Sequence, residues 1–378
     1  MQQLGPATPM SFPGYHYGMA TVAQVVGAED DRPLRTISSL LSIACTLLVY
    51  ELVRRRTSPR AAFFLTLPFA LSPYVIGNAV WLMTDLPALL FVALAMAPLI
   101  QRGPIRDTPS VWFYAAVVAV PAAVAVRQVH VWLTAVLAAF VIATSTPVGS
   151  AMPEEWSLST RWRPARICLG VFGALVAILL ITYLFVQWGN LSPTSYPGPV
   201  PHPAVWTSVS AQAALFGGPM LLLLPARAFR LPRPLWFALG ACALATALLP
   251  SSFSVESGRW GGWLWSLTDR LPQFVGRSPL MAALSASGTL TIALLGHAAL
   301  IKPQNAPRAL ILLSALAGFI AAHAVHPVCF QRYYEPFVLM WCALCAALAG
   351  ARARSRWRML PLFVLSVLQF ILTLVRVV

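Results

Sequence analysis

The chain has 378 residues, of which 58% are hydrophobic and only 10% are charged, and its formal net charge is +15. Ordinary soluble domains carry about 25% charged residues, so the composition excludes that class and predicts a membrane protein. The positive charge does not indicate nucleic-acid binding, because the arginines lie in short clusters between apolar runs, as topology signals do. We expect membrane lipids, and no nucleic acid, among the partners.

Apolar runs close to membrane-spanning length recur from Leu34 to the C-terminus. A helix needs roughly 20 apolar residues to cross the hydrocarbon core. We therefore predict an all-α fold, a polytopic transmembrane helical bundle with about 12 membrane segments. The runs cover 34–53, 61–76, 84–100, 110–126, 130–146, 167–187, 206–224, 235–250, 279–300, 309–325, 336–350 and 359–375.

Lysine and arginine are concentrated in every second link between these runs. Because such residues gather on the cytoplasmic side, the pattern predicts that the N-terminal segment and the C-terminus face outward across the plasma (inner) membrane. We expect an outer-face loop at 1–33 and a single transmembrane domain at 34–378. The basic links lie at 54–60, 102–106, 161–166, 227–233, 302–308 and 352–358.

Asp85 stands at the start of the third run, in the segment Thr84-Asp85-Leu86-Pro87. One interpretation is a helix start, in which a polar side chain caps free N–H groups and proline occupies the first turn. The other is a functional carboxylate at the outer boundary, because ionisable groups at membrane depth are costly and usually functional. Such a group binds an acceptor hydroxyl, a metal or a proton.

Arg127-Gln128-Val129-His130 interrupts the apolar stretch from Val111 to Phe140 and predicts a helical hairpin that dips to the outer face. Either Arg127 extends its charged end to the membrane interface, or it binds a phosphate, which a guanidinium matches in geometry.

The link after the run at 309–325 is the most polar end of any run. His323 and His326 are spaced for a weak metal site. Arg332 is followed by two tyrosines and Glu335, which favours a site for a lipid phosphate and a sugar. The alternative is an interfacial aromatic belt.

Two further outer segments carry polar or amphipathic signals. His202 lies in a loop that its prolines stiffen. Within 251–278, bulky apolar residues share one helical face and predict an amphipathic helix in the outer interface. They are Trp260, Trp263, Leu264, Leu267 and Leu271.

The motifs, taken in order, resemble those of the GT-C glycosyltransferases, which use polyprenyl-phosphate-linked sugars at the outer or lumenal face. The nearest branch is similar to the enzymes that add the terminal α-1,2-glucose to the lipid-linked oligosaccharide. The matching segments are Pro13-Gly14-Tyr15-His16-Tyr17, Thr84-Asp85-Leu86-Pro87, Arg127-Gln128 and Gln331-Arg332-Tyr333-Tyr334-Glu335-Pro336.

This resemblance implies an inverting hexosyltransferase that moves a sugar from a polyprenyl-phosphate donor to a lipid-linked or cell-envelope glycan acceptor. It implies Asp85 as the catalytic carboxylate, and Arg127 and Arg332 as ligands of the donor phosphate. It implies no certain cofactor and allows a divalent cation. The expected substrate pocket contains Tyr15, His16, Gln128, His202, Tyr334 and Glu335.

The sequence departs from the family pattern before Pro13, where it has neither an apolar helix nor an Asp or Glu. We expect the family's first helix and first acidic loop to be missing from this chain, either because it starts late or because it is a catalytically inactive relative. A multi-pass transporter is the other alternative, although the polar residues gather at one face and no inverted repeat supports it.

Overall fold

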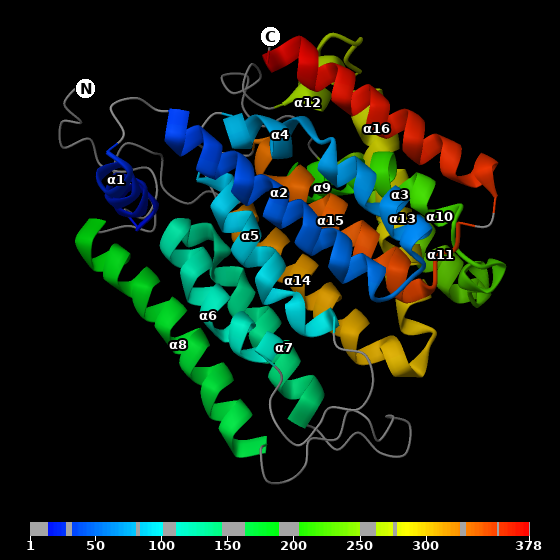
Figure 1. Ribbon diagram of the computed structural model, residues 1–378. Coiled ribbons are helices and arrows are strands. Elements are labelled where there is room, and N and C mark those ends of the chain that lie inside the picture. The colour runs from blue at the N-terminus through cyan, green and yellow to red at the C-terminus, as the bar shows by residue number, and fades with distance from the viewer. Residues whose placement is uncertain are drawn as a thin grey trace.

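The computed structural model describes residues 14–27, 32–80, 84–100, 111–145, 163–188, 204–249, 262–274, 278–325, 330–353 and 355–377. These residues form helices joined by short links, and no β-strand occurs among them (Figure 1). The all-α prediction is therefore confirmed for the described part of the chain.

The helices follow the predicted apolar runs closely, with breaks inside some of them. The α-helices are α1 (Gly14–Val26), α2 (Arg32–Arg54), α3 (Pro59–Ala70), α4 (Pro73–Val80), α5 (Asp85–Ala95), α6 (Val111–Val126), α7 (Leu133–Ser145), α8 (Arg163–Trp188), α9 (Ala204–Gln212), α10 (Gly218–Leu221), α11 (Arg233–Leu248), α12 (Trp263–Asp269), α13 (Pro279–Leu300), α14 (Ala306–Ala324), α15 (Gln331–Ala349) and α16 (Arg356–Val377). Short turns complete the order: η1 (Ala97–Ile100), η2 (Gln128–Trp132), the π-turn η4 (Ala213–Gly217), η5 (Ala226–Phe229) and η7 (Pro303–Asn305).

The structure differs from the predicted elements in two places. The run at 61–76 is two helices, α3 and α4, bent by 59°. Pro73 begins α4, and a proline has no N–H to continue the preceding helix. The segment 1–33, which was predicted as an outer-face loop, contains helix α1.

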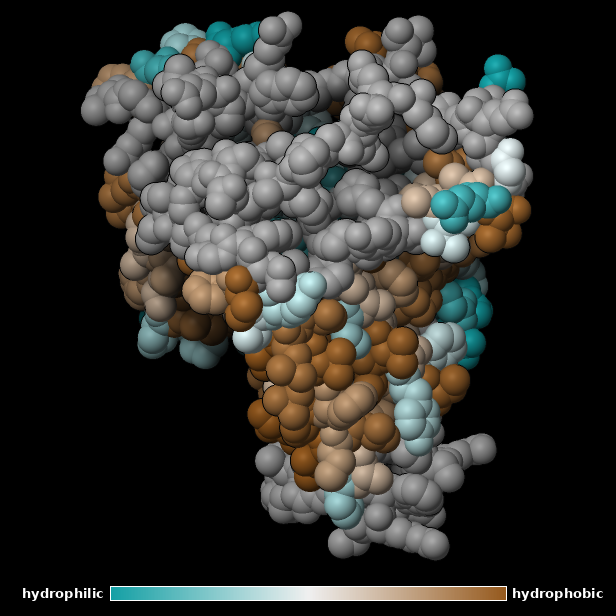
Figure 2. Space-filling model, turned by 90° about the vertical axis from the view of Figure 1, so that its left-hand side faces the viewer, coloured by the Kyte–Doolittle hydropathy of each residue, from teal (hydrophilic) through white to brown (hydrophobic). Residues whose placement is uncertain are grey.

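Four described helices are long and apolar enough to cross a membrane, and the bent pair α3–α4 would make a fifth. The four are α2, α13, α14 and α16. Many apolar side chains of α8, including Phe172, Leu179 and Val186, are exposed. Figure 2 shows a broad hydrophobic surface on the side of the molecule where α8 lies in Figure 1. A surface of this kind is stable in contact with lipid rather than water, so the chain is a multi-pass membrane protein. The count of about 12 membrane segments stays a prediction.

Helix α15 is the centre of the bundle, and nearly all of its residues are buried. It lies in the middle of the view in Figure 1, behind α2, and packs against α3, α9 and α13. Its first turn carries Arg332 and Tyr333.

Replacing Gly288 with leucine is expected to destabilise the bundle. A Cβ atom at Gly288 would overlap the backbone carbonyl of Ser210, where α13 packs against α9, and backbone cannot move aside as a side chain can. Overpacking typically costs about 1–3 kcal/mol, and close helix approach at glycine is a common membrane contact. We expect a lower thermal unfolding midpoint in detergent. Gly240→Leu is the matched control, because open space surrounds that glycine; equal midpoints for the two variants would contradict the packing argument.

Candidate functional site

Four helix ends and the turn η2 surround a pocket near the expected outer end of the bundle. Helix α5 begins there, α6 ends there, and the end of α14 lies close to the start of α15. The pocket contains about 440 Å³ of empty space, including the part that is open to solvent. Its described lining residues are Asn78, Asp85, Leu89, Val92, Arg127, Val129, His130, Trp132, Phe319, His323, Arg332, Tyr333, Pro336 and Phe337.

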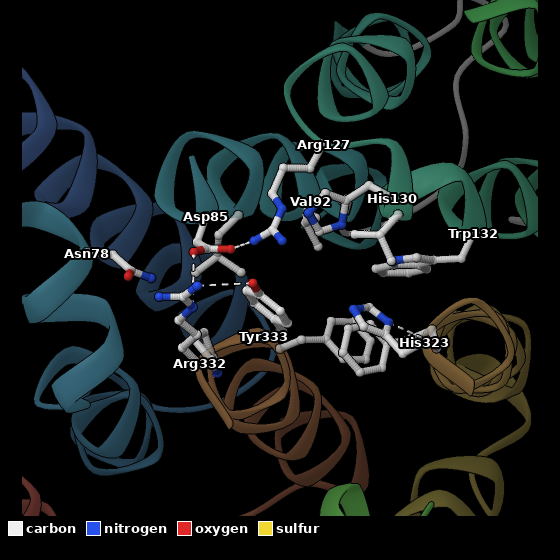
Figure 3. Close-up of a pocket in the computed structure, with 14 residues that line it drawn as sticks. Asn78, Asp85, Val92, Arg127, His130, Trp132, His323, Arg332 and Tyr333 are labelled. Carbon is white, nitrogen blue, oxygen red and sulfur yellow. Dashed lines mark hydrogen bonds and ion pairs between the residues drawn. The ribbon is translucent and has the colours of Figure 1, made fainter. Parts of the chain in front are cut away.

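The charged end of this pocket is built around the carboxylate of Asp85. Arg127 forms an ion pair with one carboxylate oxygen, and Nε of Arg332 lies 3.9 Å from the other. The Asp85 side chain is only 10% exposed and that of Arg127 only 14%, so water screens the pair weakly. Figure 3 shows the three side chains pointing toward one another, from the start of α5, the break after α6 and the start of α15.

The aromatic ring of Tyr333 contacts the guanidinium groups of both arginines. The Arg127 guanidinium carbon lies 4.3 Å from the centre of the tyrosine ring, and that of Arg332 lies 5.0 Å away. Arg332 also donates a hydrogen bond of 3.1 Å to the tyrosine hydroxyl. A guanidinium over an aromatic face is favourable, so Tyr333 holds both cations beside the carboxylate.

The local chain path explains how these charges meet. Asp85 is the first residue of α5, where the positive end of the helix dipole favours a carboxylate. Asp85 begins a helix and also faces the pocket, but Thr84 makes no side-chain capping hydrogen bond. A functional role for the Asp85 carboxylate stays a prediction. Arg127 follows α6 in an extended conformation, with φ −147° and ψ 118°. That break, together with η2, is the interruption that the sequence predicts between α6 and α7.

The other end of the pocket is aromatic. Trp132 packs edge-to-face against Phe319 and Phe337, with ring centres 5.5 and 5.0 Å apart. Nδ1 of His323 lies 2.9 Å from the carbonyl oxygen of Phe319. Because a carbonyl only accepts, Nδ1 is the donor in this contact.

Three buried polar atoms of the pocket have no hydrogen-bond partner within the described residues. They are Nδ1 of His130, Nε1 of Trp132 and Nε of Arg332. Most buried polar atoms in proteins are paired, and exceptions often have functional causes. Their gathering around one pocket indicates a place for a polar ligand.

The structure brings together Asp85, Arg127 and Arg332, three residues expected to act in one site. Gln128 begins η2 and is not among the pocket-lining residues. Tyr15 and His16 lie in α1, and their side chains are not among those that the structure describes. His202 and His326 also lie outside the described residues.

Glu335 was expected in the substrate pocket, but it is fully buried and is not one of the described pocket-lining residues. It accepts hydrogen bonds from Ser72 Oγ at 2.7 Å, Gln331 Nε2 at 2.7 Å, Trp263 Nε1 at 3.1 Å and Gln369 Nε2 at 3.2 Å. These donors come from the α3–α4 link, α15, α12 and α16. The arrangement makes Glu335 a structural junction of four segments.

Tyr334 is likewise fully buried and absent from the described pocket lining. The helical repeat of α15 explains both placements. Positions 332, 333 and 336 lie on the side that faces the pocket, whereas 331 and 335 are four apart and share a different face. Neighbours in one sequence motif therefore point to different parts of the protein.

Replacing Glu335 with glutamine is expected to lower the thermal stability of the protein. Four donors converge on the carboxylate, and the amide nitrogen of glutamine would place a further donor against one of them. A buried donor without an acceptor costs about 1–3 kcal/mol. Thermal unfolding in detergent measures the effect, with the more exposed Glu51→Gln as control. An unchanged midpoint for Glu335→Gln would show that the junction does not stabilise the fold.

The amphipathic helix predicted within 251–278 corresponds to α12, although Trp260 lies outside the described residues. Leu264 is buried, whereas Leu267 and Leu271 are 48% and 38% exposed. The backbone N–H of Trp263 donates to the Tyr74 hydroxyl at 3.0 Å, which ties α12 to α4. The location of α12 in the membrane interface stays a prediction.

Asn78, His130 and Trp132 are not among the site residues expected from the sequence, yet they line the pocket, as does Tyr333, one of the two tyrosines after Arg332. His130 and Trp132 follow directly after the Arg127 motif, and this closeness is the signal that would have found them. The sequence leaves two interpretations of Tyr333 open, a substrate site and an interfacial aromatic belt, and it does not show that Arg127 and Arg332 lie over its ring.

The described residues contain no group of three or more His, Cys, Asp or Glu side chains that could hold a metal. In the pocket, Asp85 faces two guanidinium groups, an environment that suits an anion better than a divalent cation.

Comparison with known proteins gives one family match and one similar solved structure. A family model described as dolichyl-phosphate-mannose-protein mannosyltransferase matches residues 8–154, the segment that carries Asp85, Arg127 and His130. Among solved structures, the chain is similar to ArnT from Cupriavidus metallidurans in the apo state, at 14% identity and a TM-score of 0.36, over 90% of this chain and 67% of that one. No curated protein matches the chain.

Proposed function

We propose that this protein is a membrane glycosyltransferase of the GT-C type, which takes its sugar from a polyprenyl-phosphate donor. The observation that carries the proposal is the meeting of Arg127 and Arg332 around Asp85 in one pocket of a membrane protein. The family match over 8–154 supports the same class of donor, since its description names a lipid-phosphate-linked sugar.

The reaction needs the three charges in defined roles. An acceptor hydroxyl oxygen forms a bond to the anomeric carbon, and the bond from that carbon to the phosphate oxygen breaks. The polyprenyl phosphate leaves with the electron pair, so negative charge grows on the phosphate. Arg127 and Arg332 stabilise this charge, and stabilisation of developing charge by prearranged donors usually contributes most to catalysis. Asp85 accepts the hydroxyl proton or orients the acceptor.

The Nε–H group of Arg332 supports the phosphate role. This buried N–H lies 3.9 Å from Asp85 and has no hydrogen-bond acceptor within the described residues. A phosphate oxygen between the two guanidinium groups would satisfy it. Charge-assisted hydrogen bonds of this kind are roughly twice as strong as neutral ones.

The sugar, the acceptor, the stereochemistry and the membrane side complete the proposal. We propose an inverting transfer of a hexose to a lipid-linked or cell-envelope glycan, at the outer face of the plasma membrane. The alternating arginine clusters favour this orientation, and an outer-face enzyme would use a lipid-borne sugar because no soluble nucleotide-binding motif occurs in the sequence.

The proposal is tested with purified protein in proteoliposomes that contain polyprenyl-phosphate-linked labelled hexoses and extracted envelope glycolipids. We expect protein-dependent loss of the donor, with label appearing in a larger lipid-linked or envelope product. Donor binding without transfer would indicate a catalytically inactive relative. Protein-dependent movement of an intact solute across the bilayer, without transfer, would support a transporter instead.

A further inference from the structure

We infer that Gln331 is a positioning residue for Arg332. The Gln331 side chain joins the first turn of α15 to helix α12 and to Glu335, and in this way it holds the Arg332 guanidinium beside Asp85. The inference rests on the proposed function, because it names the residue that fixes one half of the proposed phosphate site.

The place of Arg332 in the chain explains why its guanidinium needs support. Arg332 is the second residue of α15, and Phe330, the residue before this helix, has an apolar side chain that cannot cap it. The first N–H groups of a helix lack partners inside it, and helix ends fray. In addition, the Asp85 carboxylate faces the guanidinium groups of both Arg127 and Arg332, which repel each other. Other contacts must therefore hold the start of α15 in place.

The side chain of Gln331 supplies such contacts on two sides. Its Oε1 accepts a hydrogen bond of 3.0 Å from the backbone N–H of Leu264 in α12, and its Nε2 donates one of 2.7 Å to Oε2 of Glu335. A backbone N–H can only donate, which fixes the orientation of the amide. Gln331 is 5% exposed, so water competes little for either bond. Residues four apart on a helix are neighbours, and the bond to Glu335 therefore braces the turn that carries Arg332.

The start of α12 is shaped to receive the Gln331 side chain. Gly262 precedes this helix with φ +127°, a conformation that favours glycine. A Cβ atom at Gly262 would overlap the side chain of Gln331 and the hydroxyl of Tyr74, so the close approach depends on glycine. The Tyr74 hydroxyl accepts from the N–H of Trp263 at 3.0 Å, next to the Leu264 N–H that Gln331 binds. Side chains of α4 and α15 therefore satisfy the first N–H groups of α12.

Glu335 extends these contacts to the α4 side of the pocket. Ser72 donates a hydrogen bond of 2.7 Å to the Glu335 carboxylate, and its Oγ accepts one of 3.2 Å from the N–H of Tyr74 at the start of α4. Further along α4, Asn78 lines the pocket (Figure 3). The hydrogen bonds of Gln331 and Glu335 thus set the start of α15 relative to α4 as well as to α12.

The deciding experiment is a double-mutant cycle on Gln331 and Arg332. Purified protein in detergent is tested for binding of polyprenyl phosphate and of uncharged polyprenol, and the ratio of the two affinities measures phosphate recognition. Gln331→Met keeps an unbranched side chain and removes both hydrogen bonds. We expect the preference for the phosphate to fall about threefold to tenfold, as for one lost hydrogen bond, with unchanged affinity for polyprenol. In the Arg332→Ala background the same substitution should have no further effect, because a residue that acts through another is not additive with it.

Asn305→Leu is the matched control. Asn305 is also a buried amide bonded to α15, since its Nδ2 donates to the Leu348 carbonyl at 2.8 Å near the opposite end of the helix. Its replacement should leave the preference for the phosphate unchanged. Gly262→Ala is a second test variant, because it pushes α12 away from Gln331 without altering α15. It should lower the preference as Gln331→Met does, and it decides the question if Gln331→Met does not fold.

The outcomes separate the inference from the proposed function. An unchanged preference in the folded test variant, an equal loss of affinity for both lipids, or the same loss with and without Arg332 would overturn the positioning role alone. An equal loss in Asn305→Leu would also overturn it. If the wild type shows no preference for polyprenyl phosphate over polyprenol, the proposed function fails and the inference fails with it.

Discussion

Replacing Arg332 with alanine is expected to lower kcat/KM for sugar transfer about 100- to 1,000-fold, by analogy with the loss of one donor to a developing oxyanion. Arg332 supplies a buried Nε–H without a hydrogen-bond partner in the described structure, and Tyr333 holds its guanidinium in place. Leaving-group charge grows on the phosphate during the reaction, so the loss should fall mainly on kcat. Initial rates of transfer in proteoliposomes measure it.

Two variants make the Arg332 result specific. Arg332→Lys keeps the positive charge but lacks the planar set of N–H donors of a guanidinium. Its transfer rate should lie between those of Arg332→Ala and the wild type. Arg352→Ala removes an arginine beyond the opposite end of α15 and should leave the rate unchanged. Full transfer activity in correctly folded Arg332→Ala protein would refute the phosphate role.

Replacing Asp85 with asparagine is expected to lower kcat about 100- to 10,000-fold, the usual contribution of a positioned acid or base. Asparagine has nearly the same size but cannot take the proton of the acceptor hydroxyl. Binding of polyprenyl phosphate should persist or tighten, since the two guanidinium groups would lose their competing carboxylate. Single-turnover transfer and direct binding of the lipid phosphate measure the two effects separately.

The opposite pattern would change the role of Asp85. If Asp85→Asn weakens lipid-phosphate binding and transfer to the same extent, the carboxylate acts by positioning Arg127 and Arg332 rather than by handling a proton. Asp85→Ala distinguishes these cases further, because it removes both the charge and the hydrogen-bonding group.

The helices could be predicted from the sequence because a long apolar run indicates a segment within lipid. The backbone N–H and C=O groups of such a segment must hydrogen-bond to one another, as they do in a helix. The break between α3 and α4 depends on Pro73, which the sequence displays but whose 59° bend it does not specify. Helix α1 was not predicted, because the Pro-Gly and aromatic residues at its start resemble a loop.

The charged end of the pocket could be predicted because the apolar runs place Asp85, Arg127 and Arg332 at helix ends. The placements of Glu335 and Trp132 could not be predicted. Glu335 belongs to the same sequence motif as Arg332, but three residues further along α15 its side chain lies on a different face of the helix. There it accepts hydrogen bonds from the α3–α4 link, α12 and α16. Trp132 resembles an ordinary interfacial aromatic residue until its packing against Phe319 and Phe337 is known.

The central claim, that Arg127 and Arg332 bind the phosphate of a polyprenyl-linked donor, is tested most directly by comparing binding of polyprenyl phosphate and of uncharged polyprenol to the purified protein. The two lipids differ only in the phosphate, so the ratio of their affinities isolates its recognition. We predict at least a tenfold preference for the phosphate, roughly the contribution of one charge-assisted hydrogen bond, and loss of that preference in the Arg127→Ala/Arg332→Ala variant. Equal affinity of the wild type for both lipids, or an undiminished preference in the double variant, would contradict the claim.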